Sequence, residues 1–164
     1  MSPVNSGITF STDATEGNSR RVSVGIDIDG PFTQPILKLH FPRWVPGSYF
    51  LREPIQHMTE FVAIDDAGVE LNSFRYEVDA MKIKVPQNTK SVSITYKLLA
   101  TELSCRSNHL DSSHIHIMPP FTWFLPTSGI NLERMNQKHS ISLHTPSSWS
   151  AATQYKLENS TSCK

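Results

Sequence analysis

Apolar and polar residues alternate with a period of two along much of this chain. The alternation is clearest in residues 22–28, 37–41, 74–78, 81–85 and 92–98, and it returns briefly at 141–143. Successive side chains of a β-strand point to opposite faces, so each stretch predicts a strand with one apolar face. Turn signals such as Pro46-Gly47 separate the stretches.

No stretch of helical length shows a convincing 3.6-residue period. Residues 51–64 come nearest, but Pro54 interrupts their start and β-branched residues crowd their end. A series of roughly six to nine strands without helices predicts an all-β fold, an antiparallel β-sandwich or saddle with long loops.

The 164 residues predict a single β-domain, residues 1–164, that buries roughly two-thirds of its unfolded surface. Residues 1–20 are rich in Ser, Thr, Asn and Gly and are expected to form a loose start. Residues 150–164 form a polar tail without a stop signal, which favours a truncated fragment of a longer protein.

Composition argues against several partners. Fifteen basic and fifteen acidic residues leave no net charge, which disfavours nucleic acid and anionic membranes. No apolar run approaches the ~20 residues of a membrane-spanning helix. Residues 1–10 carry no visible secretory signal, which favours a cytoplasmic protein. Cys105 and Cys163 are then expected to be reduced thiols, and a disulfide between them stays open as the alternative.

One turn-forming segment is dense in aromatic residues. Pro46-Gly47 suits the centre of a type II turn, because proline fixes φ at about −65° and glycine accepts positive φ. Trp44 precedes this turn, Ser48 and Tyr49 follow it, and Arg52 comes three residues after the tyrosine. Composition alone predicts a packed loop at one end of the sandwich.

A second segment gathers His109, Asp111, His114 and His116 within eight residues. If residues 113–118 form a strand, His114 and His116 point to the same side. A metal site of His109, His114 and His116 is then one alternative, with zinc, copper or nickel as the ion. The plainer alternative is a hydrogen-bonded pair of His109 and Asp111 that orders a loop.

The sequence predicts no catalytic residues. A zinc peptidase centre of the thermolysin type needs His-Glu-x-x-His on a helix, and no histidine here is followed by glutamate. Ser48 lies in Pro-Gly-Ser-Tyr and not in the Gly-x-Ser-x-Gly of a nucleophile elbow. The chain is therefore not expected to be an enzyme on its own.

Another aromatic segment offers a different function. Phe121, Trp123 and Phe124 are predicted to be strand and interface core. If they were exposed instead, the domain would be a free-standing β-sandwich that binds peptide or glycan.

The two motif segments, in this order, resemble the amino-terminal β-domain of the glycyl aminopeptidase family of PDZ-containing zinc metallopeptidases. The residues that carry the resemblance are Trp44, Pro46, Gly47, Ser48, Tyr49, Arg52, Arg106, His109, Asp111 and His114. The resemblance covers residues 37–149. It implies a non-catalytic domain that packs on a thermolysin-like catalytic domain and shapes its substrate cleft. Zinc and the bound peptide would belong to that downstream domain.

The resemblance also places residues near the substrate. It implies that His114, His116 and Met118 contact the cleft. Relatives tend to continue with two aromatics, Asn and Gly after the histidine, whereas this chain has Ile115, His116, Ile117 and Met118. The amide that would suit a peptide amine is therefore absent here.

Overall fold

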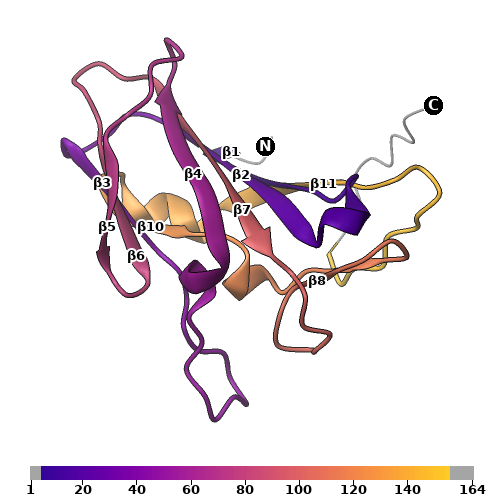
Figure 1. The fold of residues 1–164 in the computed structure, drawn as a ribbon. Helices are drawn as coiled ribbons and strands as arrows, with labels where there is room; N and C mark the ends of the chain where they lie inside the picture. The colour runs from indigo at the N-terminus through magenta and orange to yellow at the C-terminus, as the bar shows by residue number, and fades with distance from the viewer. Residues whose placement is uncertain (1–4, 156–164) are drawn as a thin grey trace.

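The structure is a computed structural model and describes residues 5–155. Two sheets make up most of the molecule (Figure 1). The five-stranded sheet has the order β11-β1-β2-β7-β4, formed by β11 (Lys138–His144), β1 (Asn5–Asp13), β2 (Arg21–Asp29), β7 (Ser91–Leu99) and β4 (Met58–Asp65). The four-stranded sheet has the order β10-β3-β6-β5, formed by β10 (Leu125–Ser128), β3 (Ile36–His40), β6 (Ala80–Lys84) and β5 (Ser73–Glu77).

Short elements join the strands. A two-stranded hairpin pairs β8 (His109–Leu110) with β9 (Ile115–His116). The helical turns are 3₁₀ helices: η1 (Gly17–Ser19), η2 (Pro54–His57), η3 (Pro119–Phe121) and η4 (Leu132–Asn136). Within residues 5–155, no helix is long and apolar enough to cross a membrane.

The period-two pattern explains the central strands. Buried and exposed residues alternate along β2 and β7, which pair with Val22 opposite Leu98 and Ile26 opposite Ile94. The buried faces of the two sheets contribute to one hydrophobic core. The all-β class, and the strands predicted from these stretches, are confirmed.

Three aromatic side chains lie at the centre of this core. The rings of Phe41 and Phe124 stack with centroids 3.9 Å apart, and Tyr96 packs edge-on against both. The Tyr96 hydroxyl donates to the Thr122 carbonyl at 2.7 Å and accepts from the Phe124 N–H at 3.3 Å. Burial raises the pKa of Tyr96 well above its ordinary value, so the phenol stays protonated as this donor.

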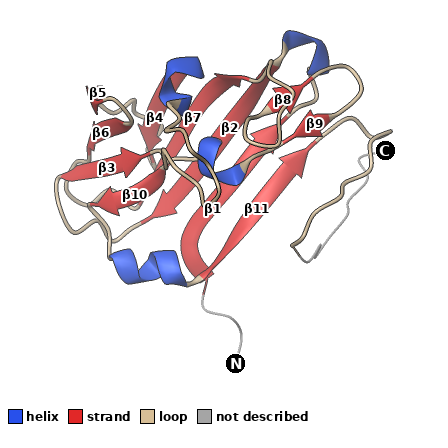
Figure 2. Cartoon of the chain, turned by 90° about the horizontal axis from the view of Figure 1, so that it is seen from below, coloured by secondary structure: helices blue, strands red, loops and turns tan. Residues whose placement is uncertain are grey.

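The structure corrects two predictions about the ends of the chain. The predicted loose start at residues 1–20 does not hold for the described residues 5–20, because β1 begins at Asn5 and buries Ile8 and Phe10 in the core. The prediction of antiparallel pairing fails for one pair, since β11 lies parallel to β1 at an edge of the larger sheet (Figure 2). The polar tail lies largely beyond the described residues, and its predicted truncation stays a prediction.

Two internal segments also differ from their predictions. Residues 51–64, the nearest approach to a helical pattern, form η2 and then β4. Phe121, Trp123 and Phe124 do not form a strand but are buried, beginning in η3, so they cannot present a sugar- or peptide-binding surface. The described part contains eleven strands instead of roughly six to nine, and β8 and β9 have only two residues each.

Replacing Tyr96 with phenylalanine should destabilise the fold by about 1–3 kcal/mol, because the Phe124 N–H loses its acceptor inside the core. Urea unfolding measures the change. Tyr49→Phe is the matched control, since the Tyr49 side chain is 95% exposed. Equal unfolding midpoints for the two variants would show that the buried hydroxyl contributes nothing.

Candidate functional site

The first candidate site is the loop between β3 and β4, residues 43–53, here called the motif loop. Its tip is the predicted type II turn: the Ser48 N–H donates to the Val45 carbonyl at 3.1 Å, and Gly47 has φ +84°. A residue with a Cβ is strained at that φ, which explains the glycine.

Polar contacts close the motif loop on itself. At its base, the Arg52 N–H donates to the Arg43 carbonyl at 2.8 Å, and the Arg43 guanidinium pairs with Glu53 at 3.0 Å. Nearer the tip, Trp44 Nε1 donates to the Ser48 carbonyl at 2.8 Å. The Ser48 hydroxyl is buried and donates to the Phe50 carbonyl at 3.0 Å. The loop therefore has a fixed shape without packing on the core.

The motif loop presents apolar side chains to solvent. Tyr49, Phe50 and Leu51 are 95%, 67% and 64% exposed, and Trp44 is half exposed. Figure 1 shows the loop projecting beyond the sheets. The prediction of a packed loop is wrong, because the aromatic side chains that would anchor it point away from the core.

A second loop, residues 101–107, lies beside the motif loop. Arg52 Nη1 is 3.9 Å from Glu102 Oε2, and Leu103 adds another exposed apolar side chain. A hollow of about 180 Å³ opens between the two loops and is lined by Arg52 and Arg106. The structure thus brings together the two arginines of the motif segments. A larger hollow of about 310 Å³ over β1, β2 and β7 contains none of the motif residues.

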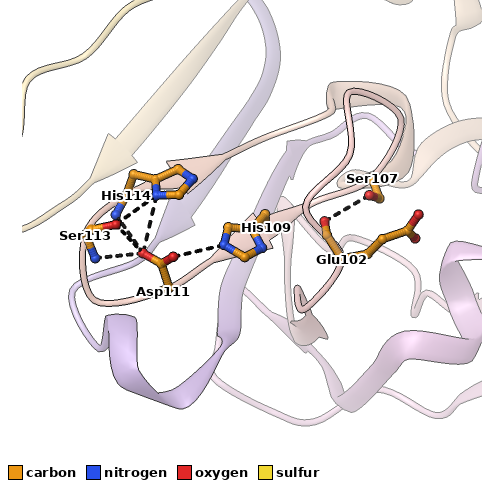
Figure 3. A network of polar contacts seen from close by, with 6 residues as sticks. All are labelled: Glu102, Ser107, His109, Asp111, Ser113 and His114. Carbon is orange, nitrogen blue, oxygen red and sulfur yellow. Dashed lines mark hydrogen bonds and ion pairs between the residues drawn. The ribbon is translucent and has the colours of Figure 1, made fainter.

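The second candidate site is the hairpin formed by β8 and β9, residues 109–116, here called the histidine hairpin (Figure 3). Asp111 lies between two imidazoles: its Oδ2 is 3.1 Å from His109 Nε2, and its Oδ1 is 3.3 Å from His114 Nδ1. Oδ1 also accepts from the Ser113 N–H, the Ser113 hydroxyl and the His114 N–H at 2.7, 2.7 and 3.0 Å. The predicted loop-ordering pair of His109 and Asp111 is therefore present.

These contacts determine the charge of Asp111. The Ser113 hydroxyl, followed by His109 and the backbone N–H of Ser113, holds the pKa of Asp111 well below its ordinary value. Each hydrogen bond stabilises the charged form, so the side chain is a carboxylate at neutral pH.

Burial differs across the cluster. The His109 side chain is 7% exposed, and within residues 5–155 its Nδ1 is buried without a hydrogen-bond partner. Asp111 and His114 are 28% and 47% exposed. One ligand atom from each of the three residues lies within 4.8 Å of the others. His40, Glu77 and Asp79 form a second group of this kind.

The structure changes the predicted metal set. Residues 113–118 are not one strand, because β9 comprises only Ile115 and His116. His116 pairs with His109 in the ladder, and its Nδ1 lies 3.0 Å from the Ser107 carbonyl. His116 thus does not join His109 and His114 in a common ligand group, and Asp111 takes that place.

Sequence reasoning missed Asn108, which fixes the histidine hairpin to η3. Its buried side chain accepts from the Met118 N–H at 2.7 Å and from the Thr122 hydroxyl at 2.9 Å, and it donates to the Phe121 carbonyl at 3.1 Å. These partners are ten to fourteen residues away in the chain, and a single Asn after a serine gives no sequence signal for them. Cys105 is an exposed free thiol, and Cys163 lies outside the described residues.

Ser113→Ala should raise the pKa of Asp111 toward its ordinary value, because the serine hydroxyl is the largest cause of the lowering. The stability that the carboxylate contributes is present above its ordinary pKa and is lost as pH falls through the lowered one. The variant should therefore lose this stability at higher pH. NMR titration of the Asp111 carboxyl carbon measures the pKa. Ser112→Ala is the control, and an unchanged curve in Ser113→Ala would contradict the assignment.

Comparison with solved structures shows the same fold in part of a larger protein. The crystal structure of an aminopeptidase N family protein from Idiomarina loihiensis matches with a TM-score of 0.74 at 20% sequence identity. The match covers 85% of this chain and 22% of that protein, so this chain spans about a fifth of its length.

Comparison with families gives the identity of the domain. No curated protein matches the chain. The family described as "Peptidase M61 N-terminal domain" matches residues 9–163, nearly the whole chain. The resemblance drawn from the two motif segments is thereby confirmed: the chain belongs to the peptidase M61 N-terminal domain family.

Proposed function

We propose that this domain is the non-catalytic amino-terminal part of a glycyl aminopeptidase-like zinc metallopeptidase, and that it docks on a thermolysin-like catalytic domain through the motif loop. The observation that carries the proposal is the set of exposed apolar side chains on a loop whose shape is already fixed. Contiguous exposed apolar surface is typical of an interaction site, and its burial against a partner is favourable.

The surroundings of the motif loop support a docking role. The loop at 101–107 extends the apolar surface with Leu103, and Arg52 and Arg106 line the hollow between the loops. Such a combination of apolar anchors and arginine is typical of interface centres. Because hydrogen bonds within the motif loop hold its shape, docking would cost little ordering of the backbone.

The peptidase zinc does not fit this chain. The sequence has no His-Glu-x-x-His, so the ligands and the glutamate that activates water would belong to the catalytic domain. There the ion would supply a zinc-bound water that attacks the scissile carbonyl. The residues of this domain would contribute the wall of the cleft, and the domain alone should leave glycyl substrates at the background rate of hydrolysis.

His114, His116 and Met118 are the residues we propose for that wall. His114 is about half exposed, and His116 and Met118 are partly buried next to it in sequence. Asp111 and Asn108 hold this segment in place, so a polar side chain there can meet the substrate without further ordering.

Docking is tested by mixing this domain with the catalytic domain of a peptidase M61 enzyme and measuring the dissociation constant by calorimetry. Replacing Tyr49 and Phe50 together with serine should weaken the complex at least tenfold, about 1.4 kcal/mol or more in total, because buried aromatic anchors dominate interfaces. Ile141→Ser with Leu143→Ser is the matched control, since both side chains are about half exposed and lie in β11, at the edge of the larger sheet opposite β4. Equal losses in the two double variants would reject the motif loop as the docking surface.

The cleft role is tested in an enzyme that carries this domain joined to its catalytic domain. Alanine at both His114 and His116 should raise KM for a glycyl peptide roughly fivefold, about 1 kcal/mol, because a polar contact to bound substrate is lost. His144→Ala, at an exposed histidine of β11, is the control. If KM and kcat both stay unchanged in the double variant, these histidines do not line the cleft.

A further inference from the structure

We propose that His109, Asp111 and His114 form a Zn²⁺ site in the histidine hairpin. This inference does not depend on the proposed docking function, because all three ligands come from residues 109–114 of this domain. Two imidazoles and one carboxylate are common zinc ligands.

The distances suit a tetrahedral ion. Zinc lies about 2.0–2.2 Å from nitrogen and oxygen ligands, so neighbouring ligand atoms of a tetrahedron are about 3.3 Å apart. The two carboxylate oxygens of Asp111 each lie near one imidazole, Oδ2 at 3.1 Å from His109 Nε2 and Oδ1 at 3.3 Å from His114 Nδ1, and one ligand atom from each of the three residues lies within 4.8 Å of the others. An ion can therefore replace the two contacts between Asp111 and the imidazoles with small side-chain movements.

The ligands are largely fixed in advance. His109 is buried in β8, and Asp111 accepts hydrogen bonds from the backbone N–H groups of Ser113 and His114. Gly17 lies against the backbone of Asp111. A Cβ added to Gly17 would come 2.5 Å from the Asp111 carbonyl oxygen.

The site is also open to the ion. Asp111 and His114 are partly exposed, so Zn²⁺ can enter from solvent and keep water in the remaining position. Three protein ligands with one open position distinguish this arrangement from a closed structural site.

One feature limits the affinity. When zinc binds Nε2 of a neutral histidine, the ring proton resides on Nδ1 and normally donates to an acceptor. Nδ1 of His109 is buried without a partner among the described residues. We therefore expect micromolar and not nanomolar binding.

A second group provides an internal competitor. His40, Glu77 and Asp79 also offer ligand atoms within 4.8 Å. His40 Nε2 is already 2.5 Å from the Tyr76 hydroxyl, however, and Lys82 lies over the Tyr76 ring at 4.2 Å, which places a positive charge nearby. Zinc should prefer the histidine hairpin for these reasons.

Calorimetric titration of the 164-residue chain with ZnCl₂ tests the site. We expect one ion per chain with a micromolar dissociation constant, and at least tenfold weaker binding in His114→Ala. This exposed side chain can be removed without opening the core. His144→Ala should bind as tightly as the unmodified chain, and circular dichroism should show all variants folded. Bound Co²⁺ should give the visible absorption of a tetrahedral complex, and His114→Ala should abolish it.

Three results would contradict the zinc site. Absence of zinc binding at millimolar concentration would overturn the proposal, and so would binding that is unaffected by His114→Ala. Loss of binding in His40→Ala but not in His114→Ala would place the ion at the other group and would also overturn it. None of these results bears on docking, which is measured with the catalytic domain present.

Discussion

The Tyr96 hydroxyl joins the larger sheet to the segment that holds the histidine hairpin. It is buried in β7 and bonds to the backbone of Thr122 and Phe124, immediately after η3. The same segment holds the Asn108 side chain, which in turn accepts from the Met118 N–H. A chain of buried hydrogen bonds therefore runs from the sheet to the histidine hairpin. Because unpaired buried polar groups are costly, these contacts fix one arrangement of otherwise irregular backbone.

The predictability of this fold follows from the range of the interactions. β2 and β7 could be predicted because each buries alternate residues against the core. This period of two is visible in the sequence of the strand itself. The parallel pairing of β11 with β1 could not be predicted, because it joins residues more than a hundred positions apart. In addition, Ile141 and Leu143 of β11 stay about half exposed. The start at β1 was missed because Ile8 and Phe10 stand among polar residues.

Within the candidate sites, too, the features that depend on near neighbours in the sequence could be predicted, and those that depend on the whole fold could not. The type II turn of the motif loop and the pair of His109 and Asp111 were predictable, because both rest on neighbours within three residues. The exposure of Tyr49 was not, because aromatic composition alone favours burial and only the fold shows that the core is already filled. Asp111 displaced His116 from the ligand group because β9 is too short to put His114 and His116 on one strand face.

The two candidate sites use different physics, and this bears on how they would work together. The motif loop presents apolar surface, so its binding energy would come from water released by Tyr49 and Phe50. The histidine hairpin holds a charged, hydrogen-bonded cluster that is worth most where water is excluded. His114 belongs to both proposals: its Nδ1 faces Asp111 or an ion, which leaves Nε2 to meet a substrate group. An ion at Nδ1 would fix the ring and leave its proton on Nε2, so zinc in the hairpin would let His114 donate to a substrate acceptor.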